Sequence, residues 1–275
     1  MDIIQTLAQE LDKNPQHVEN VVRLLDEGNT IPFIARYRKE ATGGIDDVAL
    51  RELDDRLAYL RTLEARKADV LKAIDEQGKL TDDLRSKIEA ATVMQRVEDL
   101  YKPYKKKRAT RASKARDAGL EPLALLILAQ GRSDKSPLAL AAELANAEAG
   151  FPTAEAALQG ARDIVAETIA DDAEHTAVLR SFTQRTGSLA VEATDAQEKT
   201  VYESYYDFSE PLSRIPNHRV LAVNRGEKEG KLRVKVRVQA AADVEQLERR
   251  VVTRPPRHFA GTLRAAVSDR TTRQL

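Results

Sequence analysis

The chain has 275 residues, 42% of them hydrophobic and 32% charged, and its 44 basic and 44 acidic side chains give a formal net charge of zero. This composition excludes a disordered chain, and zero net charge means that any attraction to nucleic acid must come from local patches. The sequence has no cysteine, which excludes disulfides, thiolate zinc sites and cysteine nucleophiles. The N-terminus lacks the basic region and apolar run of a signal peptide, so a cytoplasmic location is expected.

Helix-start and helix-stop residues predict two helices near the N-terminus. Asn14-Pro15 is typical of a helix start and Gly28-Asn29 of its end. A shorter helix is expected over residues 31–39, before Gly43-Gly44, and one of these glycines is expected at positive φ. This helix carries three bases, Arg36, Arg38 and Lys39. The outline is that of a DNA-binding helix-turn-helix, and the alternative is a hairpin that serves only packing.

The longest helix is expected to start at Asp46-Asp47 and to end at Gly78, because leucines recur between them at three- and four-residue steps. The pattern lapses at Glu64 and Lys67, which favours a packed helix over a coiled coil. Further helices are expected to start at Thr81, Thr92, Glu121, Ser136, Thr153 and Asp171-Asp172. The helix from Ser136 is expected to reach Gly150.

The pattern changes after Gly187. A short strand is expected over residues 188–192. Residues 231–238 read K-L-R-V-K-V-R-V, a strict alternation that predicts a strand with one apolar face. Two more helices are expected, one around residues 244–252 and one from about His258.

These elements predict a mostly α fold. It is expected to be an elongated multi-helix scaffold with a helix-turn-helix-like hairpin and a minor β element near 188–192 and 231–238. The expected domains are a helical region over residues 1–190 and a segment of mixed helix and strand over residues 191–275.

The residue types that usually carry catalysis lack the necessary arrangement. The histidines are scattered without the spacing of metal ligands, and no phosphate-binding loop, dinucleotide fingerprint or nucleophile elbow occurs. The acidic pairs Asp46-Asp47, Asp82-Asp83 and Asp171-Asp172 stand at predicted helix starts, where they cap free N–H groups. Asp54-Asp55 is expected to face solvent. We therefore expect no catalytic residue, no metal site and no cofactor.

The strongest functional signal is the stretch Tyr101–Arg116, which reads Y-K-P-Y-K-K-K-R-A-T-R-A-S-K-A-R and contains no acid. Its tyrosines are suited to stacking on bases and its cations to binding phosphates. The candidate nucleic-acid-binding residues here are Tyr101, Lys102, Tyr104, Lys105, Lys106, Lys107, Arg108, Arg111, Lys114 and Arg116. The alternatives are a solvated linker and a surface that docks on an acidic domain.

Three blocks of sequence resemble those of a known family. They are T-I-P-F-I-A-R-Y-R-K-E-A-T-G-G at Thr30–Gly44, D-L-Y-K-P-Y-K-K-K-R-A-T-R-A-S-K-A-R-D-A-G-L-E-P-L-A at Asp99–Ala124 and D-F-S-E-P-L-S-R-I-P-N-H-R at Asp207–Arg219. In this order and spacing they resemble the signature of the Tex family of bacterial transcription accessory proteins, and the resemblance covers essentially the whole chain.

The resemblance implies that the chain is the N-terminal helical part of a longer protein. In that family an RNase-H-like domain, generally regarded as non-catalytic, follows such a region, together with helix-hairpin-helix elements and a C-terminal OB-fold that binds RNA. The leading expectation is a non-catalytic part of a transcription accessory factor that assists binding of RNA or DNA, with little dependence on sequence. The alternatives are a protein–protein interaction scaffold, whose basic run docks on another domain or on the transcription machinery, and a piece of an enzyme whose catalytic residues lie elsewhere.

Overall fold

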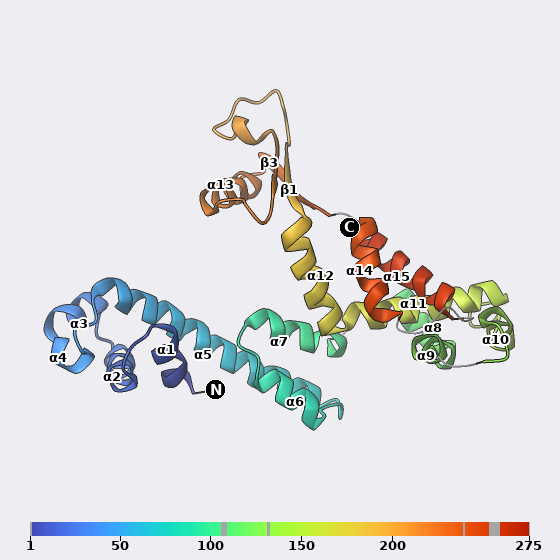
Figure 1. Ribbon diagram of the computed structural model, residues 1–275, viewed down its shortest axis with the longest axis horizontal. Helices are drawn as coiled ribbons and strands as arrows, with labels where there is room; N and C mark the ends of the chain where they lie inside the picture. The colour runs from blue at the N-terminus through green and yellow to red at the C-terminus, as the bar shows by residue number, and fades with distance from the viewer. Residues whose placement is uncertain (1, 106–108, 131–132, 239, 253–258, 275) are drawn as a thin grey trace. The chain divides into compact units, whose positions relative to one another are not determined.

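The structure is a computed structural model that describes residues 2–105, 109–130, 133–238, 240–252 and 259–274 (Figure 1). The chain forms two compact units, Met1–Lys105 and Lys106–Leu275. Helices dominate both units, and one three-stranded sheet accompanies them in the second, so the prediction of a mostly α fold is confirmed. The expected domain boundary near residue 190 stays a prediction.

The first unit is entirely helical in the part that the structure describes. Its elements are α1 (Ile3–Glu10), α2 (Pro15–Asp26), α3 (Ile31–Tyr37), α4 (Lys39–Thr42), α5 (Asp47–Asp75), α6 (Asp82–Glu89), α7 (Met94–Tyr101) and the 3-10 turn η1 (Lys102–Tyr104). Helix α1 was not predicted; Asp2 caps it by accepting a hydrogen bond from the Gln5 backbone N–H. The predicted start at Thr92 is wrong by one residue, because Val93 occupies the cap position and the Met94 N–H donates to the Tyr59 hydroxyl at 2.9 Å.

Helix α5 is the support of this unit. Its buried side chains recur at three- and four-residue steps, and α1, α2, α3, α6 and α7 all pack against it. Where the leucine pattern lapses, Lys67 takes a core position with 3% of its surface exposed. Its ammonium group lies 2.7 Å from Glu64 Oε1 and 2.9 Å from the Glu89 carbonyl oxygen, so its charge is satisfied and it ties α5 to the end of α6.

The second unit combines a helical cluster with the sheet. Its elements are α8 (Arg111–Asp117), α9 (Glu121–Ala129), α10 (Pro137–Glu143), α11 (Ala154–Asp171), α12 (Ala173–Thr186), β1 (Ser188–Ala193), η2 (Glu203–Tyr205), β2 (Asp207–Pro211), α13 (Asn217–Lys228), β3 (Leu232–Arg237), α14 (Ala240–Val251) and α15 (Ala260–Gln274). Helix α11 is central to the cluster and packs against α8, α9, α10, α12 and α15. The expected helix start at His258 lies outside the described residues.

The helix predicted from Ser136 is shorter than expected. It ends at Glu143, and the chain then turns so that Asn146 and Phe151 exchange two backbone hydrogen bonds of 2.8 Å. Gly150 belongs to this turn, with φ of 86°, rather than to the end of the helix. The acidic residues expected as caps are confirmed at Asp46 and Asp172, which accept hydrogen bonds from backbone N–H groups at their helix starts.

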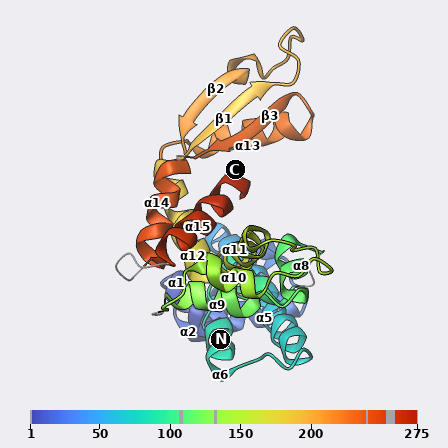
Figure 2. The ribbon, with the colours of Figure 1, turned by 90° about the vertical axis from the view of Figure 1, so that its right-hand side faces the viewer.

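The sheet is antiparallel, with strand order β2-β1-β3, and α13 packs on one face of it (Figure 2). The predicted strands near 188–192 and 231–238 are confirmed as β1 and β3, while β2 was missed. Val191 of β1 faces Phe208 of β2 and Val234 of β3 in the register. The core under this face is completed by Tyr202 and Val223.

The turn between α4 and α5 generates a prediction, because Gly43 and Gly44 both adopt positive φ, 64° and 76°. A Cβ on Gly44 would meet open space, whereas a Cβ on Gly43 would lie 2.1 Å from Nδ1 of His17. Gly44→Ala should therefore cost about 1 kcal/mol of unfolding free energy from backbone strain alone, and Gly43→Ala clearly more. Urea unfolding measures both values.

The cost of the close contact between a Cβ at position 43 and the His17 ring can be measured separately by changing His17. Removing that ring in His17→Ala should bring the cost of Gly43→Ala close to that of Gly44→Ala. If Gly43→Ala and Gly44→Ala lower the unfolding free energy equally while His17 is present, the His17 ring does not contact position 43.

Candidate nucleic-acid interface

Three of the predicted residues lie together at the junction of α3 and α4. Helix α3 ends at Tyr37, and Arg38 leaves the helical conformation with φ of −127° before α4 begins. The side chains of Arg36, Arg38 and Lys39 are exposed, and we call these three residues the α3–α4 basic surface. All three lie within four residues of the sequence, so this short segment carries a local excess of positive charge.

The α3–α4 basic surface has a rigid support. Ile34 is fully buried beneath α3, and Thr42 is fully buried at the end of α4. The Asn20 side chain of α2 donates a hydrogen bond of 2.8 Å to the Ala41 carbonyl oxygen. The Arg38 guanidinium lies over the Phe33 ring, 5.1 Å from its centre. These contacts hold the backbone that presents the three bases.

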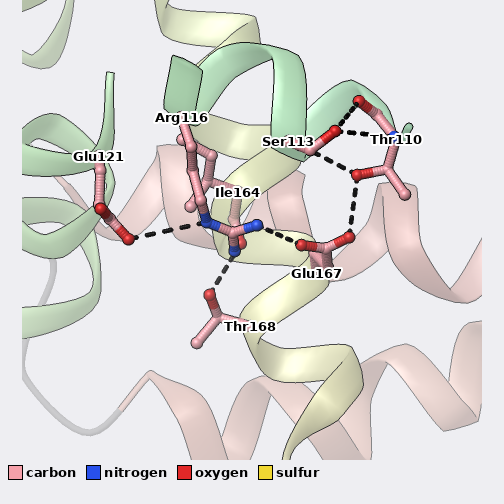
Figure 3. Close-up of polar contacts among 7 residues, drawn as sticks. All are labelled: Thr110, Ser113, Arg116, Glu121, Ile164, Glu167 and Thr168. Carbon is pink, nitrogen blue, oxygen red and sulfur yellow. Dashed lines mark hydrogen bonds and ion pairs between the residues drawn. The ribbon is translucent and has the colours of Figure 1, made fainter. Parts of the chain in front are cut away.

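Two further predicted residues form a second surface on α8. Thr110 and Ser113 cap this helix reciprocally, which fixes its start (Figure 3). Ala112 and Ala115 are buried on the side that packs against α11. Arg111 and Lys114, three residues apart on one helix face, are exposed, and we call them the α8 basic surface.

Arg116 of the same helix has a different environment. Its guanidinium pairs with Glu167 of α11 at 2.5 Å and approaches Glu121 at 3.7 Å (Figure 3). Glu167 also accepts a hydrogen bond of 3.0 Å from the Thr110 hydroxyl. Arg116 therefore joins α8 to α11, and its charge is already balanced inside the protein.

The predicted residues at the end of the first unit also engage other side chains. Glu98 accepts hydrogen bonds from Arg66 at 2.7 Å and from Lys105 at 2.5 Å. The Tyr101 ring lies close to the same two cations, with its centre 5.4 Å from the Arg66 guanidinium and 5.5 Å from the Lys105 ammonium. The Tyr104 carbonyl oxygen accepts a hydrogen bond of 3.1 Å from Gln77. A base that stacked on Tyr101 would have to compete with these cations.

The remaining predicted residues divide as follows. Lys102 is half-buried in the turn η1. Lys106, Lys107 and Arg108 lie outside the described residues. The described ranges contain no group of three or more histidine, cysteine, aspartate or glutamate side chains that could hold a metal ion, and no helix in them is long and apolar enough to cross a membrane.

The acidic partners of the paired bases were not predicted from the sequence. Arg66 and Glu98 are 32 residues apart, and Arg116 and Glu167 are 51 residues apart. No local spacing signals either pair, because each depends on how separate helices pack. Tyr37 was not predicted as a site residue either, although it stands between Arg36 and Arg38 in the sequence and is 61% exposed.

The ion pairs of Glu98 generate a prediction about pH. Hydrogen bonds from Arg66 and Lys105 lower the pKa of the Glu98 carboxyl below its ordinary value of 4.5. A carboxyl with a lowered folded-state pKa contributes stability that is fully present above its unfolded pKa and is lost as the pH falls through its folded pKa. Glu98→Gln should therefore destabilise the protein at pH 7, and the gap from the parent should narrow as the pH falls below about 4.5.

Urea unfolding of the parent and of Glu98→Gln tests this. The unfolding midpoint of each protein is measured at intervals of about half a pH unit between about pH 3 and pH 7. Glu52→Gln, an exposed carboxyl on α5, is the matched control. If the difference in unfolding free energy between the parent and Glu98→Gln stays constant or grows at acid pH, the carboxylate charge of Glu98 is not stabilising.

The sequence of the chain is similar to that of known proteins. A model described as "Tex-like protein N-terminal domain" matches residues 1–75, and one described as "Tex central region-like" matches residues 132–273. "Protein tex" of Bordetella pertussis is 49% identical over 245 residues, which are 88% of this chain and 31% of the relative. "Transcriptional accessory protein Tex" of Neisseria gonorrhoeae is 46% identical over 241 residues, 87% of this chain and 31% of the relative.

A human protein is also similar. "S1 RNA-binding domain-containing protein 1" is 31% identical over 246 residues, which are 86% of this chain and 24% of the relative. The chain thus spans about a third or less of the length of these relatives. Both family models match in their expected order along the chain, and the central-region model alone covers more than half of it. The chain belongs to the Tex-like family.

Proposed function

We propose that this chain is a non-catalytic helical part of a transcription-associated protein of the cytoplasm, and that it contacts the phosphate backbone of RNA or DNA. The observation that carries the proposal is the exposed cluster of Arg36, Arg38 and Lys39 in a chain whose net charge is zero. A local excess of cations attracts a polyanion, whereas a balanced molecule as a whole does not. The names of two relatives, which refer to transcription and to RNA binding, support the same role.

The two basic surfaces differ in chemistry from the bases at Lys105 and Arg116. Those two are neutralised by Glu98 and Glu167, and a phosphate would have to displace a carboxylate from each. Arg36, Lys39, Arg111 and Lys114 have no such partner among the residues that the structure describes. We therefore assign phosphate contacts to the α3–α4 and α8 basic surfaces, with Lys106, Lys107 and Arg108 as further candidates.

Contacts of this kind bind weakly and without sequence preference. Phosphate contacts position a protein on nucleic acid but carry no sequence information. If the chain works beside a separate RNA-binding domain, as the name of the human relative implies for that protein, even weak contacts raise the overall affinity by holding the ligand near. The role is therefore an assisting one.

The salt dependence of binding tests the proposal. Each lost phosphate contact should lower the slope of log affinity against log salt by about 0.7–0.9. Replacing Arg36, Arg38 and Lys39 with alanine should lower the slope by about 2–3, and replacing Arg111 and Lys114 by about 1.5–2. Fluorescence anisotropy with labelled RNA and DNA of several sequences measures both, and all sequences should weaken alike.

A charge-matched control uses three exposed bases elsewhere, Arg185, Arg233 and Lys235, replaced together with alanine. This control should keep the parent's slope, since the proposal depends on position and not on total charge. Arg116→Ala should lower the melting temperature and leave the slope unchanged. If the α3–α4 variant binds like the parent at every salt concentration, this surface does not contact phosphates.

The alternative, a protein–protein interaction scaffold, is favoured by one observation. Leu125 and Leu126 of α9 are 59% and 45% exposed, and large exposed apolar side chains can serve as contacts in a protein interface. In this case the basic surfaces would dock on another domain or on the transcription machinery. The alanine variants of the α3–α4 and α8 basic surfaces discriminate the two functions. If the chain is an interaction scaffold, these variants should retain nucleic-acid binding and lose binding to purified RNA polymerase.

The absence of catalysis is also open to experiment. Asp55 is exposed on α5, as expected, whereas Asp54 is half-buried. The chain should leave single-stranded RNA intact in the presence of Mg²⁺ or Mn²⁺. Metal-dependent cleavage that Asp54→Asn and Asp55→Asn abolish would overturn this part of the proposal.

A further inference from the structure

An exposed aromatic ring stands among the bases of the α3–α4 basic surface. Tyr37 is the last residue of α3, and it is 61% exposed. Arg36 precedes it and Arg38 and Lys39 follow it. Residues 31–40 contain three cations and one acidic residue, Glu40, so the charge of this segment is +3 − 1 = +2.

The Tyr37 ring is supported on one side. Phe33 lies one helical turn before it, and the two ring centres are 5.3 Å apart with an angle of 47° between the planes. Phe33 is half-buried, and the Arg38 guanidinium lies 5.1 Å from its centre. The contact with Phe33 thus restrains the Tyr37 side chain, while most of the Tyr37 surface remains in water.

Packing does not explain this exposure. Among the residues of α3, the one that is fully buried is Ile34, and Tyr37 lies outside that buried position. A tyrosine left largely in water contributes much less to the core than a buried side chain does. A restrained, exposed aromatic ring is instead suited to stack on another planar group.

We propose that Tyr37 stacks on an unpaired base, so that the α3–α4 basic surface prefers single-stranded nucleic acid to duplex. This inference rests on the proposed function and names its ligand class. Arg36 and Lys39 would meet the phosphates on either side of the stacked nucleotide. In a duplex each base is already stacked and paired, so only the phosphate contacts would remain.

The charge around the ring favours nucleic acid over a protein partner. Neither Arg36 nor Lys39 has an ion-pair partner in the described part of the chain, and a single-stranded nucleic acid supplies both the anions and the planar bases. The support beneath the surface, through Ile34 and the hydrogen bond from Asn20 to the Ala41 carbonyl, means that little ordering is needed on binding.

The test compares Tyr37→Ala and Tyr37→Phe in the 275-residue chain, with a labelled single-stranded RNA and the duplex of the same sequence. Tyr37→Ala should weaken binding of the single strand about 5- to 150-fold, the range that corresponds to stacking on one base, and change duplex binding less than about twofold. Tyr37→Phe keeps the ring and should bind like the parent. Val48→Ala removes another exposed apolar side chain of this unit, 73% exposed, and should also bind like the parent.

A 2-aminopurine in the single strand provides a readout of stacking itself. Its fluorescence should be quenched by the parent and by Tyr37→Phe, and much less by Tyr37→Ala at saturating protein. Melting temperatures of the variants check that α3 is intact; if Tyr37→Ala unfolds, Tyr37→Ser and Tyr37→Leu replace it in the same comparison.

The outcomes separate this inference from the proposed function. If Tyr37→Ala binds the single strand like the parent, while the triple variant of Arg36, Arg38 and Lys39 binds weakly, the stacking role is wrong and the phosphate role stands. Equal weakening on single strand and duplex also overturns stacking. If neither variant changes nucleic-acid binding but Tyr37→Ala loses binding to RNA polymerase, the surface is a protein interface and both proposals are wrong for it.

Discussion

Burial of the leucine face of α5 is the constraint on which the first unit depends. The leucines of this face have at most 3% of their surface exposed; they are Leu50, Leu53, Leu57, Leu60 and Leu63. Each fully buried leucine stabilises the fold by about 1.5–3 kcal/mol, but only where other elements exclude water from it. The five helices that pack on α5 exclude water from these leucines. Helix α3 is one of them, so the packing that buries Ile34 also fixes where the α3–α4 basic surface lies.

The second unit depends on small residues in a comparable way. Ala157, Gly160 and Ala161 of α11 are buried, and they let neighbouring helices approach closely. A Cβ on Gly160 would lie 2.6 Å from Leu120 Cδ1 and 2.7 Å from a ring carbon of Phe151. This close packing brings α8 onto α11, with two consequences for charge: Arg116 meets Glu167, and the opposite face of α8 is left to solvent.

The same type of side chain therefore has two roles in this protein. Paired bases such as Lys105 and Arg116 join elements within a unit, and the pairs are partly shielded from solvent. Because the pairs remain partly exposed, each contributes on the order of 1 kcal/mol or less, so they specify geometry more than they add stability. Exposed bases such as Arg36 and Lys39 stay hydrated, so folding costs little desolvation free energy for them. Their charge remains available to an external anion. Composition and net charge do not distinguish the two roles.

The sequence by itself determined the elements that rest on local signals. The helix starts at Asn14, Asp46 and Asp172 and the strands β1 and β3 follow from caps and from alternation within a few residues. A glycine at positive φ was expected after α4, and the structure has two, Gly43 and Gly44. The family resemblance likewise depended on contiguous blocks. For the candidate site, the sequence located the basic segments but not which of their residues are exposed.

Only the tertiary structure decided the features that join distant segments. Strand β2 is five residues long and ends in proline, and its pairing with β1 becomes evident only once the two strands meet. The N–H of Met94 finds its partner in the Tyr59 hydroxyl of another helix, so no capping residue is needed beside it. The pairing of Arg116 with Glu167, and the exposure of Tyr37, follow from which helix faces are covered. Such contacts depend on packing across many residues of sequence, where local propensities carry no information.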